Sequence, residues 1–303
     1  MINKAWHSTN PMPAQASLDE RITWHLAHAA ACGCHDIPES IKQELKRRGV
    51  PVPKRADTMS ALPDGSPPPS PPPLPLPLGD LVTPAQTALP ARVRIEGESV
   101  AIVPFVVEQH APSLYEAIVG HDDLFAYLFN GPFSDYATFA AACQAATERN
   151  DPLFFAIVDR ASGVTVGHAS YMRMAPVDRA IEVGGILYAP ALQRTRGATE
   201  AMYLMARYVF EDLGYRRYEW KCNALNAPSR RAALRLGFTF EGIFRQHMII
   251  KGRNRDTAWF SMLDHEWPRA KAAFEKWLSS DNFAEDGTQL LGLQAIRDML
   301  DGL

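Results

Sequence analysis

The stretch that decides the fold runs from Ile181 to Phe238. It begins with the apolar run IEVGGILY (181–188), whose β-branched residues are typical of a buried strand. After a turn and the polar run QRTRGATE (193–200), apolar residues recur every three or four positions, as on one face of a helix. A second strand, YEWKC (218–222), and a short helix after Asn226 complete the stretch. The predicted order is strand, tight turn, helix, strand, helix.

The turn before the first helix carries the chemistry. A helix that begins directly after a strand leaves its first backbone N–H groups without intrahelical partners. With the positive end of the helix dipole, these groups form a site for a phosphate or pyrophosphate. Arg194 and Arg196 add positive charge there. Taken alone, the pattern also fits a strand-to-helix turn that binds no ligand.

These residues together resemble the GNAT acetyltransferase superfamily. The acetyl-CoA signature of that family is Gln/Arg-x-x-Gly-x-Gly/Ala. Gln193 stands at its first position and Ala198 at its last, while Arg196 replaces its first glycine. Further segments resemble the RimJ/RimL-type subgroup: LGYRR (213–217), Asn226-x-x-Ser229, RLGF (235–238) and EG (241–242). The resemblance runs from about Arg92 to about Asn282.

The resemblance implies a mixed α/β GNAT fold, in which helices flank a central twisted mixed β-sheet. It also implies an N-acetyltransferase that takes acetyl-CoA as cosubstrate. Acetyl would pass by direct attack in a ternary complex to a primary amine, either a protein N-terminal α-amino group or a small-molecule amine. The implied cofactor-binding residues are Ile186, Leu187, Tyr188, Gln193, Arg194, Thr195, Arg196, Gly197, Ala198, Thr199, Asn226 and Ser229.

Two side chains are candidates for the catalytic steps. An amine is mostly protonated at neutral pH, so a base must take its proton. Glu182, the lone carboxylate in the apolar strand, is the candidate base, directly or through a water, and a salt-bridged structural role is the alternative. The resemblance places Ser229 near the CoA sulfur as a hydrogen-bond donor, with helix capping as the alternative. A backbone N–H between Ile186 and Tyr188 would polarise the thioester carbonyl.

Residues 1–50 are expected to form a small helical extension. Ser17 and Glu20 have capping-box spacing before a helix at about 18–31, and a second helix is expected at about 38–48. The extension contains His25, His28, Cys32, Cys34 and His35. Zinc favours such ligands, but the spacing fits no standard zinc finger and the helical pattern alone accounts for the histidines. We therefore expect no metal, and a zinc-binding adaptor is the alternative.

Residues 51–90 read as a proline-rich linker, residues 91–282 as the acetyltransferase domain and residues 283–303 as a helical tail. The run SPPPSPPPLPLP (66–77) lacks most backbone donors and is expected to be extended polyproline II. The tail is expected to pack on the domain or to serve a homodimer. Other expected elements are a hairpin over 92–105, helices at about 107–118, 136–149, 268–278 and 287–300, and strands at about 153–159, 165–174, 240–250 and 257–263.

Composition narrows the functional class. The 303 residues carry a net charge of −3, which argues against wholesale nucleic-acid or membrane-surface binding. No apolar run approaches the roughly 20 residues that cross a bilayer, and the first residues do not resemble a secretory signal, so a cytoplasmic protein is expected. The four cysteines predict no disulfide framework. The alternative function is a non-catalytic CoA-binding sensor or scaffold, with the helical extension as its interaction module.

Overall fold

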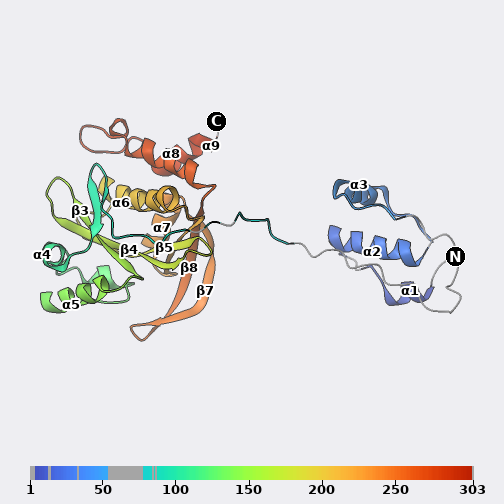
Figure 1. Cartoon of the computed structure of the whole chain (residues 1–303), viewed down its shortest axis with the longest axis horizontal. Coiled ribbons are helices and arrows are strands. Elements are labelled where there is room, and N and C mark those ends of the chain that lie inside the picture. The colour runs from blue at the N-terminus through green and yellow to red at the C-terminus, as the bar shows by residue number, and fades with distance from the viewer. Residues whose placement is uncertain are drawn as a thin grey trace. The chain divides into compact units, whose positions relative to one another are not determined.

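The protein consists of two compact units, Met1–Val82 and Thr83–Leu303. The structure, a computed structural model, describes residues 4–12, 15–32, 34–53, 78–83, 85 and 87–301 (Figure 1). The predicted polyproline segment, 66–77, lies outside these residues. Among the described helices, none combines the length and the apolar character needed to cross a membrane. The two units are described separately.

The N-terminal unit contains the helices α1 (Lys4–Thr9), α2 (Leu18–Ala31) and α3 (Glu39–Arg47) (Figure 1). Ser17 caps α2 through the predicted capping box, in which the Glu20 N–H donates to Ser17 Oγ at 3.3 Å and the Ser17 N–H donates to Glu20 Oε2 at 2.8 Å. The predicted bounds of α2 are confirmed. In the described part of this unit, the buried apolar core is small and consists of Ile22, Ala29, Ile37, Ile41 and Leu45.

The C-terminal unit is built on an eight-stranded sheet in the order β1-β2-β3-β4-β5-β6-β8-β7. Its strands are β1 (Ile95–Glu96), β2 (Val100–Pro104), β3 (Leu153–Asp159), β4 (Thr165–Ala175), β5 (Ala180–Tyr188), β6 (Arg217–Asn223), β7 (Thr239–Ile250) and β8 (Arg253–Leu263). β5 and β6 pair in parallel, whereas the other neighbours among the described strands pair antiparallel. The predicted mixed sheet is confirmed.

Helices cover both faces of this sheet (Figure 1). They are α4 (Val107–Ile118), α5 (Tyr136–Thr147), α6 (Arg196–Arg207), α7 (Ala227–Leu236), α8 (Trp267–Leu278) and α9 (Leu293–Asp301), with the short turns η1 (Asp122–Phe125), η2 (Tyr208–Asp212) and η3 (Ser280–Asn282). α4 and α5 pack on one face through Leu114, Phe139 and Cys143. α6 to α9 contribute to the larger core on the other face, where almost every residue of α6 is buried.

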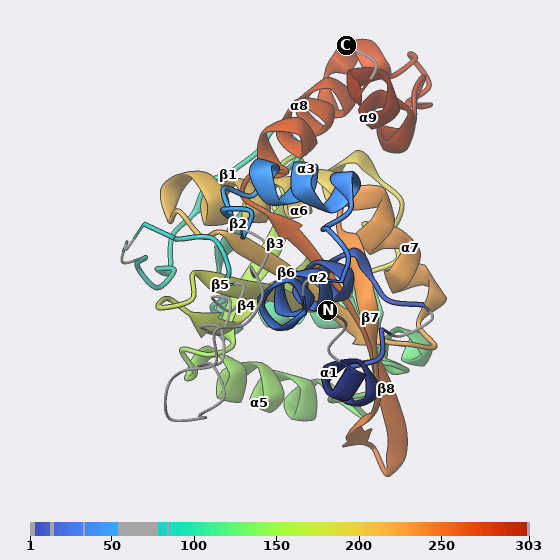
Figure 2. The ribbon, with the colours of Figure 1, turned by 90° about the vertical axis from the view of Figure 1, so that its right-hand side faces the viewer.

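Two predicted boundaries at the C-terminal side are wrong. β7 and β8 are joined by Lys251 and Gly252 alone, rather than by the expected five-residue connection, because both residues adopt positive φ (50° and 71°) as a two-residue hairpin turn requires. The helix expected from residue 287 begins only at Leu293. α9 lies beside α8 (Figure 2), and Leu293 and Ile296 are buried in the main core, so the tail packs on the domain.

Candidate active site

Short-range hydrogen bonds hold the turn that begins α6. Thr195 is the N-cap of α6, and its Oγ1 accepts a hydrogen bond from the Ala198 N–H at 3.1 Å. The Gln193 side chain donates to the Tyr188 carbonyl at 3.2 Å, and the Tyr188 hydroxyl donates to the Ala198 carbonyl at 3.1 Å. Arg194, with φ +61°, has an exposed side chain. The first N–H groups of α6 therefore lie in a fixed turn at the end of β5, where the helix dipole favours an anion.

Two of the predicted cofactor residues pack α6 against its neighbours. A Cβ atom on Gly197 would lie 2.9 Å from Val100 Cγ1, so glycine is needed for α6 to approach β2 this closely. Thr199 is buried, and its Oγ1 accepts a hydrogen bond from Arg235 Nη1 of α7 at 3.0 Å. These contacts with β2 and α7 fix the position of the first turn of α6.

Glu200, which the sequence analysis did not single out, fixes the same helix to the first hairpin. Its buried carboxylate accepts hydrogen bonds from the backbone N–H groups of Glu98, Ser99 and Val100 at 2.7, 2.7 and 2.9 Å. A Cβ atom on Gly97 would lie 2.6 Å from the Glu200 carboxyl carbon, so the turn between β1 and β2 is shaped around this side chain. Its role is structural.

The Arg196 guanidinium, at the position of the family's first glycine, is already engaged by protein groups. Its Nη2 donates to Glu98 Oε2 at 2.6 Å and also to the carbonyl of Leu278, the last residue of α8. The guanidinium carbon lies 5.4 Å from the centre of the Phe283 ring. Arg196 therefore links the start of α6 to the end of α8, and Arg194 is the arginine of this turn with an exposed side chain.

β5 is irregular where it approaches the turn. Its register with β4 shifts between the pairs Ser170–Gly184 and His168–Leu187, and Gly185 in the bulge has φ +58°. The pairs between β5 and β6 end at Val183 and Trp220. Beyond them the described part of β5 keeps β4 as its neighbour on one side and has no β6 partner on the other. This unpaired backbone includes the predicted residues Ile186, Leu187 and Tyr188.

Glu182 belongs to a buried ion network. The side chain is about 3% exposed, and its Oε2 lies 2.6 Å from Arg173 Nη1 and 2.9 Å from Lys221 Nζ. Lys221 is equally buried; it also pairs with Glu219 at 2.5 Å and lies 3.9 Å from the centre of the Trp259 ring. The salt-bridged alternative for Glu182 is therefore present. The remaining oxygen, Oε1, lies beside Gly184, where an added Cβ would approach it to 3.3 Å.

Asn226 and Ser229 begin α7. Asn226 is the N-cap, and its Oδ1 accepts a hydrogen bond from the Ser229 N–H at 3.1 Å. Ser229 Oγ accepts a hydrogen bond from the Trp220 indole at 3.0 Å, which directs the hydroxyl toward β6. Because side chains alternate along a strand, Trp220 and Lys221 point to opposite faces of the sheet. Ser229 and Glu182 thus lie on opposite faces of the sheet rather than in one cluster.

Two further buried polar groups of the sheet were not singled out by the sequence analysis. Arg255 of β8 is 7% exposed, and its Nε is buried without a hydrogen-bond partner among the described residues; its guanidinium carbon lies 4.9 Å from the centre of the Phe129 ring. His168 of β4 has a similarly unpartnered Nδ1, and burial lowers the pKa of His168 to about 4. Each is a polar residue within a predicted strand or at its edge, and this is the sequence signal that could have identified it.

The aromatic segment 122–133 has some rings in the core and others at the surface. Phe125 is buried and packs edge-on against Phe133, so these rings belong to the core. Tyr127 and Phe129 are about 40% exposed. The Tyr127 hydroxyl donates to the Leu225 carbonyl at 3.3 Å, and Phe129 lies against Arg255. The two exposed rings therefore contact β8 and the loop that follows β6.

Comparison with known proteins decides the family. A family model described as an acetyltransferase (GNAT) domain matches residues 100–239. A solved GCN5-related N-acetyltransferase from Brucella melitensis is 46% identical, with a TM-score of 0.69, over 70% of this chain and 97% of its own. The chain belongs to the GNAT family of N-acetyltransferases. A GNAT-family protein from Chromobacterium violaceum, described as a probable acetyltransferase, is 38% identical over 65% of this chain and 99% of its own, with a TM-score of 0.60. A search of curated proteins found no match.

GNAT enzymes use acetyl-CoA, and the residues here fit that cosubstrate. The start of α6 offers N–H groups and the exposed Arg194 to a pyrophosphate, while the unpaired backbone of β5 offers donors and acceptors to the amides of pantetheine. Arg196 at the glycine position leaves this arrangement intact because its side chain is bound elsewhere.

Proposed function

We propose that this GNAT enzyme transfers acetyl directly from acetyl-CoA to a primary amine, as RimJ/RimL-type enzymes do. The acceptor would be a peptide N-terminus or a small-molecule amine. The observation that carries the proposal is the unpaired backbone of β5 from Gly184 to Tyr188, next to the start of α6. Acetyl-CoA bound along this backbone would carry its thioester to the bulge at Gly185.

The two catalytic candidates would act from opposite faces of the sheet. With the thioester at the unpaired part of β5, Glu182 lies on one face and Ser229 on the other. The amine would attack the carbonyl carbon from the Glu182 face, forming the C–N bond, and the C–S bond would break toward Ser229. An N–H group of β5 between Ile186 and Tyr188 would polarise the carbonyl.

Glu182 would take the amine proton on Oε1, directly or through water. Its Oε2 is held by Arg173 and Lys221, which fixes the orientation of the carboxylate, while Oε1 faces Gly184. Ser229 Oγ accepts a hydrogen bond from the Trp220 indole, and its hydroxyl also interacts with the Cys222 side chain. The Ser229 proton would turn from Cys222 to the departing thiolate.

The sensor alternative rested on Arg196 at the glycine position. Since the Arg196 side chain binds Glu98 and the Leu278 carbonyl, its presence gives no reason to doubt acetyl transfer.

The test is free-thiol release from acetyl-CoA against a panel of amines and N-terminal peptides. We expect the wild-type chain to turn over with one acceptor class. Glu182→Gln should lower kcat by roughly 10²–10⁴-fold, because glutamine cannot accept the amine proton. Ser229→Ala should lower kcat by roughly tenfold or more, with acetyl-CoA affinity retained.

Glu219→Gln is the matched control for Glu182→Gln. It removes the other carboxylate that pairs with Lys221 but leaves Oε1 of Glu182 in place. Equal losses of kcat in the two variants would show that the network is only structural. Binding of acetyl-CoA without transfer to any acceptor would overturn the proposed function.

A further inference from the structure

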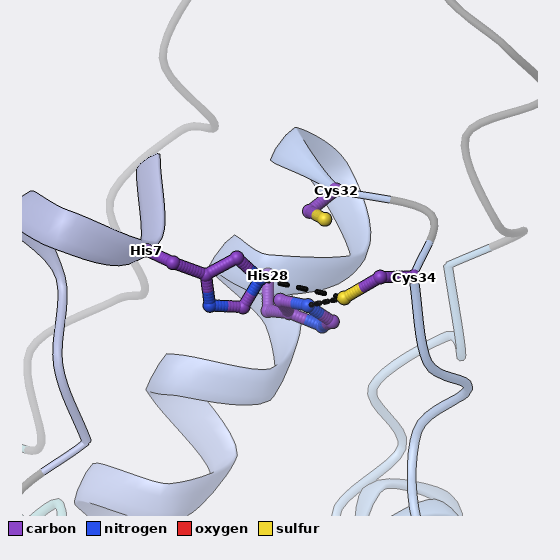
Figure 3. Close-up of side chains that lie close together, drawn as sticks. All are labelled: His7, His28, Cys32 and Cys34. Carbon is purple, nitrogen blue, oxygen red and sulfur yellow. Dashed lines mark hydrogen bonds between the residues drawn. The ribbon is translucent and has the colours of Figure 1, made fainter. Parts of the chain in front are cut away.

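Four metal-ligating side chains meet in the N-terminal unit. They are His7 of α1, His28 of α2, Cys32 at the C-cap of α2 and Cys34 just beyond it (Figure 3). One ligand atom from each lies within 4.8 Å of all the others. His7 Nε2 and His28 Nε2 lie 3.4 and 3.1 Å from Cys34 Sγ. Neither cysteine is in a disulfide.

The spacing of these atoms is close to that around a tetrahedral ion. Zinc binds sulfur at about 2.3 Å and imidazole nitrogen at about 2.0–2.1 Å, so a tetrahedral site has N···S distances of about 3.6 Å and S···S distances of about 3.8 Å. The two N···S distances found here differ from this value by about 0.2–0.5 Å. The widest pair, at no more than 4.8 Å, would move closer by at most about 1–1.5 Å, depending on whether it joins two sulfurs or two nitrogens.

The end of α2 brings three of these ligands together. His28 and Cys32 are four residues apart, which places them on the same side of the last turn of the helix. The Cys32 N–H donates to the His28 carbonyl at 2.7 Å, and Cys34 then returns its thiol toward the His28 ring. The Trp24 ring stacks on His28, with centroids 4.8 Å apart and an interplanar angle of 8°, and so holds the imidazole orientation.

The core of this unit is small. Among the described residues it consists of five buried apolar side chains, all from α2, α3 and the segment before α3. Units this small usually need a metal, disulfides or a partner to fold. His7 is the ligand that α1 contributes, so an ion at this site would bind α1 to α2.

We propose that His7, His28, Cys32 and Cys34 bind one structural zinc ion. Two thiolates and two imidazoles are ligands that zinc prefers, and four protein ligands leave no open position for catalysis. Binding releases the two thiol protons. This proposal takes the place of our expectation that the chain binds no metal. The ligand set differs from the cluster noted in the sequence, because it includes His7 and excludes His25 and His35.

The alternative is a set of thiol–imidazole hydrogen bonds without a metal. Metal analysis of the full chain, purified without a histidine tag and reconstituted with zinc under reducing conditions, separates the two. We expect one zinc ion per chain in the wild type and a loss of at least tenfold in occupancy in Cys34→Ser and His7→Ala. Cobalt in place of zinc should give the absorption of a tetrahedral site with sulfur ligands.

His25→Ala and His35→Ala are the matched controls. Both histidines lie close to the cluster in sequence, His25 stacks edge-on against Trp24, and His35 is exposed. Both variants should keep full zinc occupancy. A wild-type chain without stoichiometric zinc after reconstitution, or undiminished zinc in Cys34→Ser together with His7→Ala, would overturn the proposal. Because the measurement is metal content, it is independent of acetyl transfer.

Discussion

Each unit of the protein contains a cluster of polar side chains, but the two clusters differ in the charges of their members. In the C-terminal unit, Glu182 and Glu219 pair with Arg173 and Lys221, so the charges compensate one another. In the N-terminal unit, the four clustered side chains are two imidazoles and two thiols, with no carboxylate, guanidinium or ammonium group among them. A large core can bury a self-compensating network, whereas a small unit gains most from ligands that converge on an external cation.

Removal of zinc should produce the largest effect. Because the proposed ion contributes directly to the folding free energy of the N-terminal unit, a chelator should abolish hydrogen-exchange protection in α2 and α3. Protection in β4, β5 and α6 should be unchanged. Hydrogen exchange followed by mass spectrometry measures both units in one sample. Equal loss of protection in the two units would contradict the idea that only the N-terminal unit depends on a bound ion.

Replacement of Lys221 should give the next largest effect. Lys221→Ala removes the buried cation that Glu182 and Glu219 share and leaves them only the more exposed Arg173 and Arg217, so we expect a loss of about 3 kcal/mol in the free energy of unfolding. Lys271→Ala is the control, because Lys271 pairs with Glu211 at the surface and should cost at most about 1 kcal/mol. Urea unfolding of both variants gives the comparison.

Arg173→Gln should have the smallest effect, although Arg173 contacts the same oxygen of Glu182. The Arg173 side chain is 41% exposed, whereas that of Lys221 is 3% exposed. Solvent screens the arginine, and Glu182 keeps Lys221, so the loss should stay near or below about 1 kcal/mol. Glutamine also tolerates the positive φ at this position as arginine does. A loss as large as that of Lys221→Ala would mean that burial does not set the strength of these pairs.

Local patterns in the sequence predicted most of the fold. The capping box of Ser17 and Glu20, the apolar run of β5 and the alternation of β6 depend on residues close in the chain, so they could be read directly. The start of α9 was missed because the turn around Gly287 interrupts a pattern that still looks helical.

The candidate sites were harder to predict because their partners are distant in sequence. The pairing of Glu182 with Lys221 depends on the register of two parallel strands, which no local pattern encodes. His7 lies 21 positions before His28, and only the packing of α1 on α2 makes them neighbours. Composition suggested the ligand type in the extension, but not the ligand set.

The first two turns of α6 also determine how much of the chain the enzyme needs. Glu200 holds the backbone of residues 98–100, and Arg196 holds the last carbonyl of α8. The matching family model ends at residue 239, well before that carbonyl. A truncated chain that ended after β8 would thus lose a contact at the start of α6, the helix to which we assign the pyrophosphate.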